Sequence, residues 1–175
     1  MKTFIENKKA LSPVIATVIL VSITIVVAIS VSYWMGSLAG TYTRFESLDI
    51  SSSYASKATF LNGTFGWNIL DGTSGWNITM TLKNTGSADA TLDNVFLNAK
   101  PFNAFSNVTI LVGAACYNKT NSALSVAVGS GASQDIIIVI LAGTEQGITF
   151  SSGLTLDVKL HSAAGKEYPK LIALT

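Results

Sequence analysis

Hydrophobic residues follow two different patterns along the chain. From Leu11 to Gly40 the sequence runs for 30 residues without a charge, with Lys8 and Lys9 before it and Arg44 as the next charged residue. From Lys57 onward, short apolar runs are separated by turn residues and often alternate with polar ones. The first pattern predicts a long apolar helix, and the second predicts a domain built from strands.

The apolar segment has to be a helix that leaves water. Its aliphatic residues are mostly Val and Ile, which would also suit a buried strand, but a lone strand in a bilayer would leave its backbone polar groups unpaired. Ser12 can cap the helix, and Pro13 suits its first turn. The uncharged run from Ala10 to Thr43 would be about 50 Å long as a helix, against a bilayer core of about 30 Å. It is also longer than the apolar part of a secretory signal, roughly 7–15 residues.

Small residues recur every fourth position in this segment and predict a face on which another helix can pack closely. They are Thr24, Ala28, Ser32, Gly36 and Gly40. The alternative is that they are ordinary small residues of a lone membrane anchor. Because a three-to-four spacing of apolar residues continues from Leu38 to Leu48, we expect the helix to span residues 11–54.

The remainder, residues 55–175, is predicted to be an immunoglobulin-like β-sandwich, which makes the fold class α+β. Apolar and polar residues alternate strictly over 76–83 and 154–161, as in strands with one buried face. Further strands are expected at 59–61, 64–70, 90–97, 108–112, 124–128, 135–141 and 168–173. The run Ile136–Leu141 is apolar on both faces, so it is either a central strand covered on both sides or has one face buried by the helix or a neighbouring subunit.

The amino-acid composition argues against several functional classes. Charged residues make up 12% of the chain and the net charge is +1, which gives no basic surface for nucleic acid. Cys116 is the only cysteine and His161 the only histidine, so we expect no disulfide, zinc site or cofactor. His161 lies on the polar side of its strand beside Asp157 and Lys159 and is expected to be solvated, and Cys116 to be a small buried hydrophobic residue. We therefore expect no catalytic residues and no enzyme.

The charges around the apolar segment predict its orientation. Lys2, Lys8 and Lys9 outnumber Glu6, which places the N-terminus in the cytoplasm and the bulk of the chain outside the cell. Four Asn-x-Ser/Thr sequons lie on that outer side, and we expect some to be glycosylated. Their asparagines are Asn62, Asn77, Asn107 and Asn118, and Asn77 is expected on the outward face of its strand.

The junction Lys8-Lys9-Ala10 followed by Leu11-Ser12-Pro13-Val14-Ile15-Ala16 resembles the N-terminal segment of archaeal type IV pilins. In that family a prepilin peptidase cuts before the hydrophobic helix. The resemblance implies cleavage between Ala10 and Leu11, with residues 1–10 as a class III leader. Bacterial type IV pilins carry a glutamate at the fifth mature position. This chain has Ile15 there, and the archaeal family also lacks the glutamate. The segment Lys83–Ser87 before a strand is a second, weaker likeness.

The resemblance implies a structural subunit of an extracellular filament used for adhesion. Its implied partners are other copies of the chain, the prepilin peptidase, the cell membrane before assembly, and the pilus assembly ATPase with its membrane platform. Three alternatives stay open: an archaellin of a motility filament, a membrane-anchored binding domain that never polymerises, and a secreted protein cut after Ala39. A mature N-terminus at Leu11, Met1 or Gly40 would indicate the pilin, the plain anchor or the secreted form respectively.

Overall fold

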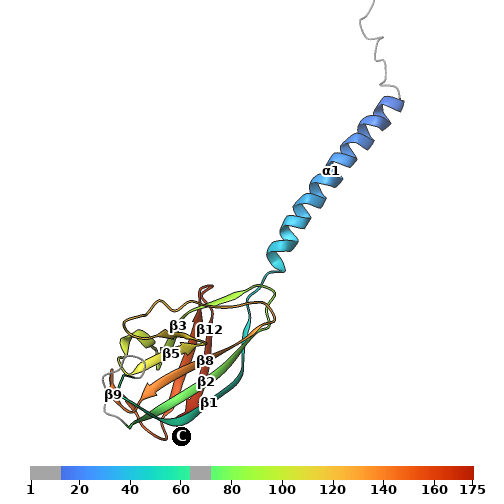
Figure 1. Cartoon of the computed structure of the whole chain (residues 1–175). Coiled ribbons are helices and arrows are strands. Elements are labelled where there is room, and N and C mark those ends of the chain that lie inside the picture. The colour runs from blue at the N-terminus through green and yellow to red at the C-terminus, as the bar shows by residue number, and fades with distance from the viewer. Residues whose placement is uncertain (1–12, 64–71) are drawn as a thin grey trace, which may run out of the picture. The chain divides into compact units, whose positions relative to one another are not determined.

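The computed structural model describes residues 13–63 and 72–175. The chain divides into two compact units between Arg44 and Phe45. The first unit contains one long helix, and the second contains mostly antiparallel sheets (Figure 1). The predicted α+β class, a long apolar helix followed by a β-sandwich, is confirmed.

Helix α1 spans Pro13–Tyr42, so the predicted end near residue 54 is wrong. Strand β1 already begins at Leu48 and runs to Phe60. The apolar spacing that suggested a helix has another origin, because Leu48 is 5% exposed and contributes to the core of the sandwich. The serine-rich residues that follow pair with β2, and this non-local pairing outweighs a weak local helix signal.

The sandwich has two large sheets. The first has the order β1-β2-β8-β5-β6, and the second has the order β12-β11-β3-β4, with β7 also pairing to β3. The strands of the first sheet after β1 are β2 (Thr73–Asn84), β8 (Ser133–Leu141), β5 (Val108–Val112) and β6 (Ala115–Tyr117). Those of the second are β12 (Glu167–Ala173), β11 (Thr155–Ser162), β3 (Ala90–Leu97), β4 (Lys100–Pro101) and β7 (Val126–Val128). A separate hairpin joins β9 (Gly143–Glu145) to β10 (Ile148–Phe150), and η2 (Phe102–Ala104) is a short 3-10 helix.

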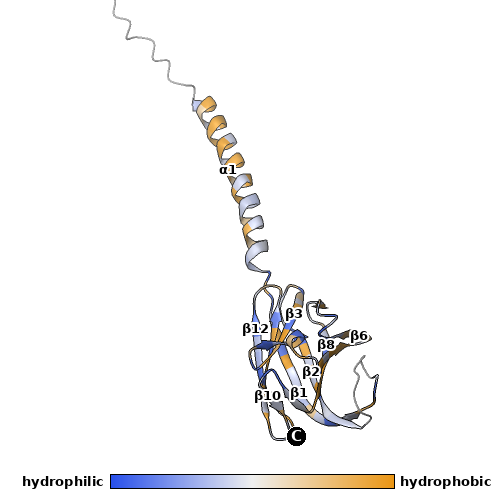
Figure 2. Cartoon of the chain, turned by 90° about the vertical axis from the view of Figure 1, so that its left-hand side faces the viewer, coloured by the Kyte–Doolittle hydropathy of each residue, from blue (hydrophilic) through white to orange (hydrophobic). Residues whose placement is uncertain are grey.

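The alternating patterns place the core as predicted. Trp76, Ile78, Met80 and Leu82 of β2 are all buried in the main core cluster, as are Leu156, Val158 and Leu160 of β11. Figure 2 shows the same alternation along the strands, and it shows hydrophobic residues concentrated toward the N-terminal part of α1. The sandwich therefore has a hydrophobic core made from its own strands.

Strand β8 resolves the question raised by the apolar run Ile136–Leu141. It is the central strand of the first sheet. Ile136, Ile138 and Ile140 lie in the main core, while Val139 and Leu141 on the other face form a second cluster with Phe60. Val139 is 1% exposed and Leu141 is 5% exposed, so both faces of β8 are buried at its C-terminal end, in agreement with the first of the two alternatives, while Ile137 is half-buried.

Most strands that the sequence predicts are found at their expected places. The bounds of β3 and β5 match the prediction, while β7, β8, β11 and β12 differ from it by a few residues. The short strands β4, β6, β9 and β10 were missed, because two or three residues carry too little periodicity. Most of β1 was missed because residues up to 54 were assigned to the helix. The strand expected at 64–70 lies outside the described residues.

Candidate functional site: the exposed helix and the start of the sandwich

Helix α1 has 30 residues, none of which is buried. Apart from the half-buried Leu38, its Val, Ile and Leu side chains are about half exposed or more, from Ile19 at 48% to Val14 at 69%. By length and composition it can cross a membrane. Burying one such side chain is worth about 1.5–3 kcal/mol, so a helix with this surface is strongly driven out of water. At 1.5 Å per residue it is about 45 Å long, which exceeds a bilayer core of about 30 Å.

Most of the serine and threonine side chains on α1 are satisfied within the helix. Five hydroxyls donate to backbone carbonyl oxygens three or four residues earlier, over 2.8–3.3 Å. The pairs are Thr17 with Val14, Ser22 with Val18, Thr24 with Val21, Ser30 with Val26 and Thr41 with Ser37. Because these hydroxyls already have partners, they cost little when the helix enters lipid or packs against another helix.

The five predicted packing residues, Thr24, Ala28, Ser32, Gly36 and Gly40, all lie on α1 and are exposed. A Cβ atom built on Gly36 or Gly40 would have no atom within 4 Å, so the chain leaves both positions open. Four residues are slightly more than one helical turn, and the series therefore winds slowly around the axis as an i±4 ridge. A helix that follows this ridge would cross α1 at an angle.

The sandwich begins with three residues, Phe45–Ser47, which we call the opening segment. The loop after β2 holds this segment through backbone hydrogen bonds at both of its ends. Thr85 and Gly86 donate to Ser47 O at 2.8 and 3.2 Å, and Ser87 and Ala88 donate to Phe45 O at 2.9 and 3.1 Å. Phe45 N donates back to Ser87 Oγ at 3.1 Å. The residues that immediately follow the first unit are thereby fixed to the body of the sandwich.

Asn84 organises the loop that makes these bonds. Its side chain is fully buried, and its Nδ2 donates to Ala88 O and to Val128 O, both at 2.8 Å. Its Oδ1 accepts the backbone N–H of Gly86 at 2.9 Å. Both amide donors are used on carbonyl groups, which an aspartate could not do.

Gly86 fits because it has no side chain. A Cβ atom there would lie 2.4 Å from Phe45 O and 2.6 Å from Ser47 N, both backbone atoms of the opening segment. The segment Lys83–Ser87, singled out in the sequence only as a likeness, thus contains two residues whose identity the local packing requires. Spacing alone could not reveal this, because the contacts join residues about 40 positions apart.

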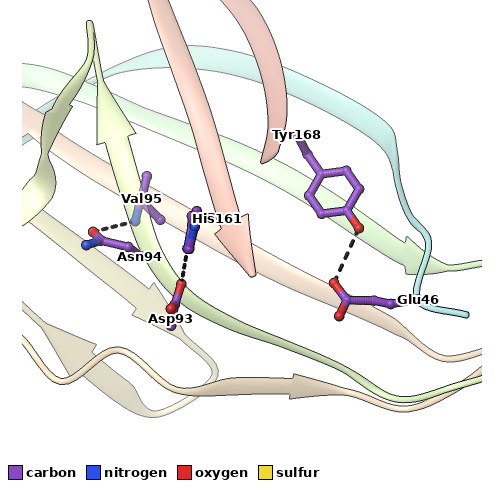
Figure 3. Close-up of polar contacts among 6 residues, drawn as sticks. All are labelled: Glu46, Asp93, Asn94, Val95, His161 and Tyr168. Carbon is purple, nitrogen blue, oxygen red and sulfur yellow. Dashed lines mark hydrogen bonds and ion pairs between the residues drawn. The ribbon is translucent and has the colours of Figure 1, made fainter. Parts of the chain in front are cut away.

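Strand β12 and the turn before it hold the middle of the opening segment. The Lys166 ammonium donates to Glu46 O, and the Tyr168 hydroxyl donates to Glu46 Oε1 at 3.3 Å (Figure 3). Burial raises the pKa of Tyr168, and the nearby Glu46 carboxylate raises it further. The phenol therefore remains a hydrogen-bond donor well above neutral pH.

His161 is paired rather than simply solvated. Its Nδ1 lies 2.6 Å from Asp93 Oδ1 (Figure 3). Its ring packs edge-on against Phe96, with ring centroids 6.2 Å apart. Lys159, its predicted neighbour, instead pairs with Glu167 at 3.0 Å. Among residues 13–63 and 72–175, no cluster of three or more His, Cys, Asp or Glu side chains could hold a metal ion.

Cys116 was expected to be buried, and this prediction is wrong. It is half-buried on β6, a strand of three residues. This strand lies at the edge of the first sheet, next to β5. Its partial burial still raises the pKa of the thiol, which therefore stays protonated at neutral pH.

The four sequons fall in different environments. Asn77 lies on the outer face of β2, as predicted, but it is half-buried and its Oδ1 is buried without a hydrogen-bond partner. Asn107 is half-buried at the start of β5, and its Nδ2 donates to Leu141 O at 3.2 Å. Asn118 lies in the loop after β6, and Asn62 lies in the turn after β1. Thr64 of the first sequon and the predicted cleavage site at Ala10 and Leu11 lie outside the described residues.

Comparison with protein-family models and with curated proteins gives no match. Among solved structures, the chain is similar to a subunit in the structure of the Iho670 flagellar-like filament. The two share 14% identity over 94% of this chain and 99% of the other, with a TM-score of 0.38. A TM-score this low does not establish a common fold.

Proposed function

We propose that the chain is a structural subunit of an extracellular filament and not an enzyme. In this proposal α1 lies in the cell membrane before assembly and then packs against the α1 helices of other copies. The observation that carries the proposal is a 30-residue apolar helix with no buried residue, joined to a sandwich with its own core. A bilayer and a bundle of apolar helices are similarly apolar, so the transfer between them changes hydrophobic free energy little.

Three features of α1 support polymerisation over simple anchoring. The helix is longer than a bilayer core requires, its hydroxyls are mostly satisfied internally, and Gly36 and Gly40 are open to close approach. The firm attachment of the opening segment suits a subunit whose helix carries load into its outer domain. An open filament results if each copy presents one surface of α1 to a different surface of the next.

The finer assignment follows the N-terminal resemblance. We propose a pilus of the archaeal type IV class used for adhesion, with an archaellin as the alternative. Maturation would require a prepilin peptidase cutting between Ala10 and Leu11, followed by extraction from the membrane by an assembly ATPase and its platform. Sequencing of the mature N-terminus tests this assignment, since Leu11 is expected, and Met1 or Gly40 would contradict it.

The assembly proposal is tested by a pair of substitutions in one turn of α1. Gly36→Leu should abolish filaments in electron micrographs of cells, because it fills an open position on the small-residue ridge. Met35→Leu, a volume-conserving change at a neighbouring exposed residue, should leave filaments intact. Both variants should keep the wild-type free energy of unfolding of the sandwich. Normal filaments from Gly36→Leu would contradict the packing role of Gly36, and a wild-type chain that stays monomeric in the membrane would favour the non-polymerising anchor.

A further inference from the structure

The loop that follows β6 presents an asparagine in an arrangement unlike that of Asn77 and Asn107. Asn118 is half-buried, and its Oδ1 accepts two backbone N–H groups, those of Thr120 and Asn121, each at 2.9 Å. Thr120 is also the hydroxyl residue of the sequon Asn118-Lys119-Thr120. The loop is closed by a bond from Asn118 N to Asn121 O at 2.9 Å and by one from Asn121 Nδ2 to Cys116 O at 2.9 Å.

This arrangement leaves the amide nitrogen of Asn118 available for reaction. Within the described part of the chain its Nδ2 has no hydrogen-bond partner, and it is not among the buried side-chain atoms that lack one, so it reaches solvent. Two N–H donors on Oδ1 draw electron density toward the oxygen and make the N–H protons of Nδ2 easier to remove. Lys119 and the residues from Thr120 to Ala123 are exposed, so a large enzyme can approach the loop.

Asn77 and Asn107 are poorly placed for glycosylation, each for its own reason. Asn77 lies in β2 between Ser56 of β1 and Val139 of β8, and the next residue, Ile78, is fully buried in the core. Asn107 directs its Nδ2 to Leu141 O, and its Oδ1 is buried. Either sequon could enter the active site of a glycosyl transferase only after strands of the first sheet separate. The loop at Asn118, in contrast, can open locally at a low cost in free energy.

From this geometry we infer that Asn118 is a glycosylation site of the folded protein, and that Asn77 and Asn107 are not. The co-substrate is an oligosaccharide joined to a polyprenyl phosphate or diphosphate in the membrane. Asn118 Nδ2 forms a bond to the anomeric carbon of the first sugar, and the bond from that carbon to the phosphate oxygen breaks. The phosphate leaves with the electron pair, and one proton leaves Nδ2 for a base of the transferase. The inference rests on the export of the sandwich, which the proposed function also requires.

The site directly follows β6, the strand at the edge of the first sheet that is labelled in Figure 2. An edge strand of three residues has solvent on its unpaired side, so a glycan there displaces no part of the core. A glycan on Asn77 would instead stand on the outer face of the sheet, beside the cluster of Phe60, Val139 and Leu141. This difference in surroundings is independent of the hydrogen bonds that activate Asn118.

The test is mass spectrometry of the full chain purified from the cells that make it. The intact mass should exceed that of the polypeptide, and the glycopeptide should contain Asn118. Asn118→Gln and Thr120→Ala should each remove the increment carried by the peptide that contains residue 118, while Thr120→Ser and Lys119→Ala, which keep the sequon, should retain it. Asn77→Gln and Asn107→Gln should leave the mass increment unchanged.

The inference is overturned by a bare peptide at Asn118, or by a glycan that maps to Asn77 or Asn107. Digestion of whole cells with an added protease separates this failure from failure of the proposed function. A sandwich that the protease reaches but that carries no glycan at Asn118 contradicts the glycosylation site alone. A sandwich protected inside the cell contradicts both proposals.

Discussion

Asn84, the last residue of β2, and Gly86, in the loop after it, act together on the opening segment Phe45–Ser47. Asn84 Oδ1 accepts the N–H of Gly86 at 2.9 Å, and Gly86 in turn packs directly against the backbone of the opening segment. The amide of Asn84 ties the same loop to Val128, which lies 44 residues farther along the chain. The start of the sandwich is therefore fixed by the buried side chain of Asn84 and by the close packing that glycine allows at residue 86.

Replacement of Asn84 by alanine should destabilise the sandwich. The change leaves the Gly86 N–H and the carbonyl groups of Ala88 and Val128 without their partner, and we expect a loss of about 3 kcal/mol in the free energy of unfolding. Asn94→Ala is the matched control, because the half-buried Asn94 side chain accepts only the N–H of Val95, and it should cost less than about 1 kcal/mol (Figure 3). Urea unfolding of the full chain in detergent, followed by tryptophan fluorescence, measures both.

Gly86→Ala should destabilise the sandwich, whereas Gly129→Ala should not. The new methyl at residue 86 would lie 2.4 Å from Phe45 O, whereas at Gly129 the nearest atom is Asp89 Oδ1 at 3.7 Å. We expect a loss of about 1–3 kcal/mol for the first change and close to none for the second. Thermal unfolding of the two variants in the same detergent provides the comparison, and equal midpoints would show that the loop can move away from the opening segment.

Neighbouring isoleucines of β8 should differ in their contribution to stability. Ile138 is fully buried in the main core, and Ile138→Ala should cost about 2–5 kcal/mol through lost contacts and a cavity. Ile137 is only half-buried on the opposite face, so the same substitution there should cost clearly less. Chemical denaturation of both variants tests whether the alternate residues of β8 face different environments.

Acid should weaken the attachment of the β9–β10 hairpin through Glu145. Burial raises the pKa of Glu145, but hydrogen bonds from Ser106 and Asn107 and the charge of Lys119 outweigh it and lower the pKa below its ordinary value of 4.5. Stability from this carboxylate is therefore present above pH 4.5 and is lost as the pH falls through the lower folded value, because the unfolded chain binds the proton more readily. Glu145→Gln should flatten the fall in unfolding free energy in this acid range.

One outcome of that pH experiment would contradict the role of Glu145. If Glu145→Gln and the wild-type chain lose stability in parallel between pH 5 and pH 3, the bonds from Glu145 to Ser106 and Asn107 contribute nothing to folding. Their geometry predicts otherwise, since Glu145 Oε1 accepts the Ser106 N–H at 2.8 Å and Oε2 accepts that of Asn107 at 3.0 Å.

The sequence by itself determined the features that depend on local periodicity. A 30-residue uncharged run can only be a helix in an apolar environment, and strict alternation in 76–83 identifies a strand with one buried face. The same reasoning located the small residues of α1 and the four sequons, because both are patterns within a few neighbouring positions.

Only the tertiary structure decided where the helix ends, which residues fix the sandwich and which sequon is open. The apolar spacing through Leu48 suited a helix, but pairing of β1 with β2 placed that residue in a strand. Asn84 and Gly86 could not be distinguished from ordinary turn residues, since their partners lie about 40 residues away. Asn77 and Asn118 have equivalent motifs, and they differ only because one lies within a sheet and the other in an exposed loop. Burial and hydrogen bonding between distant segments set these differences, and no local pattern records them.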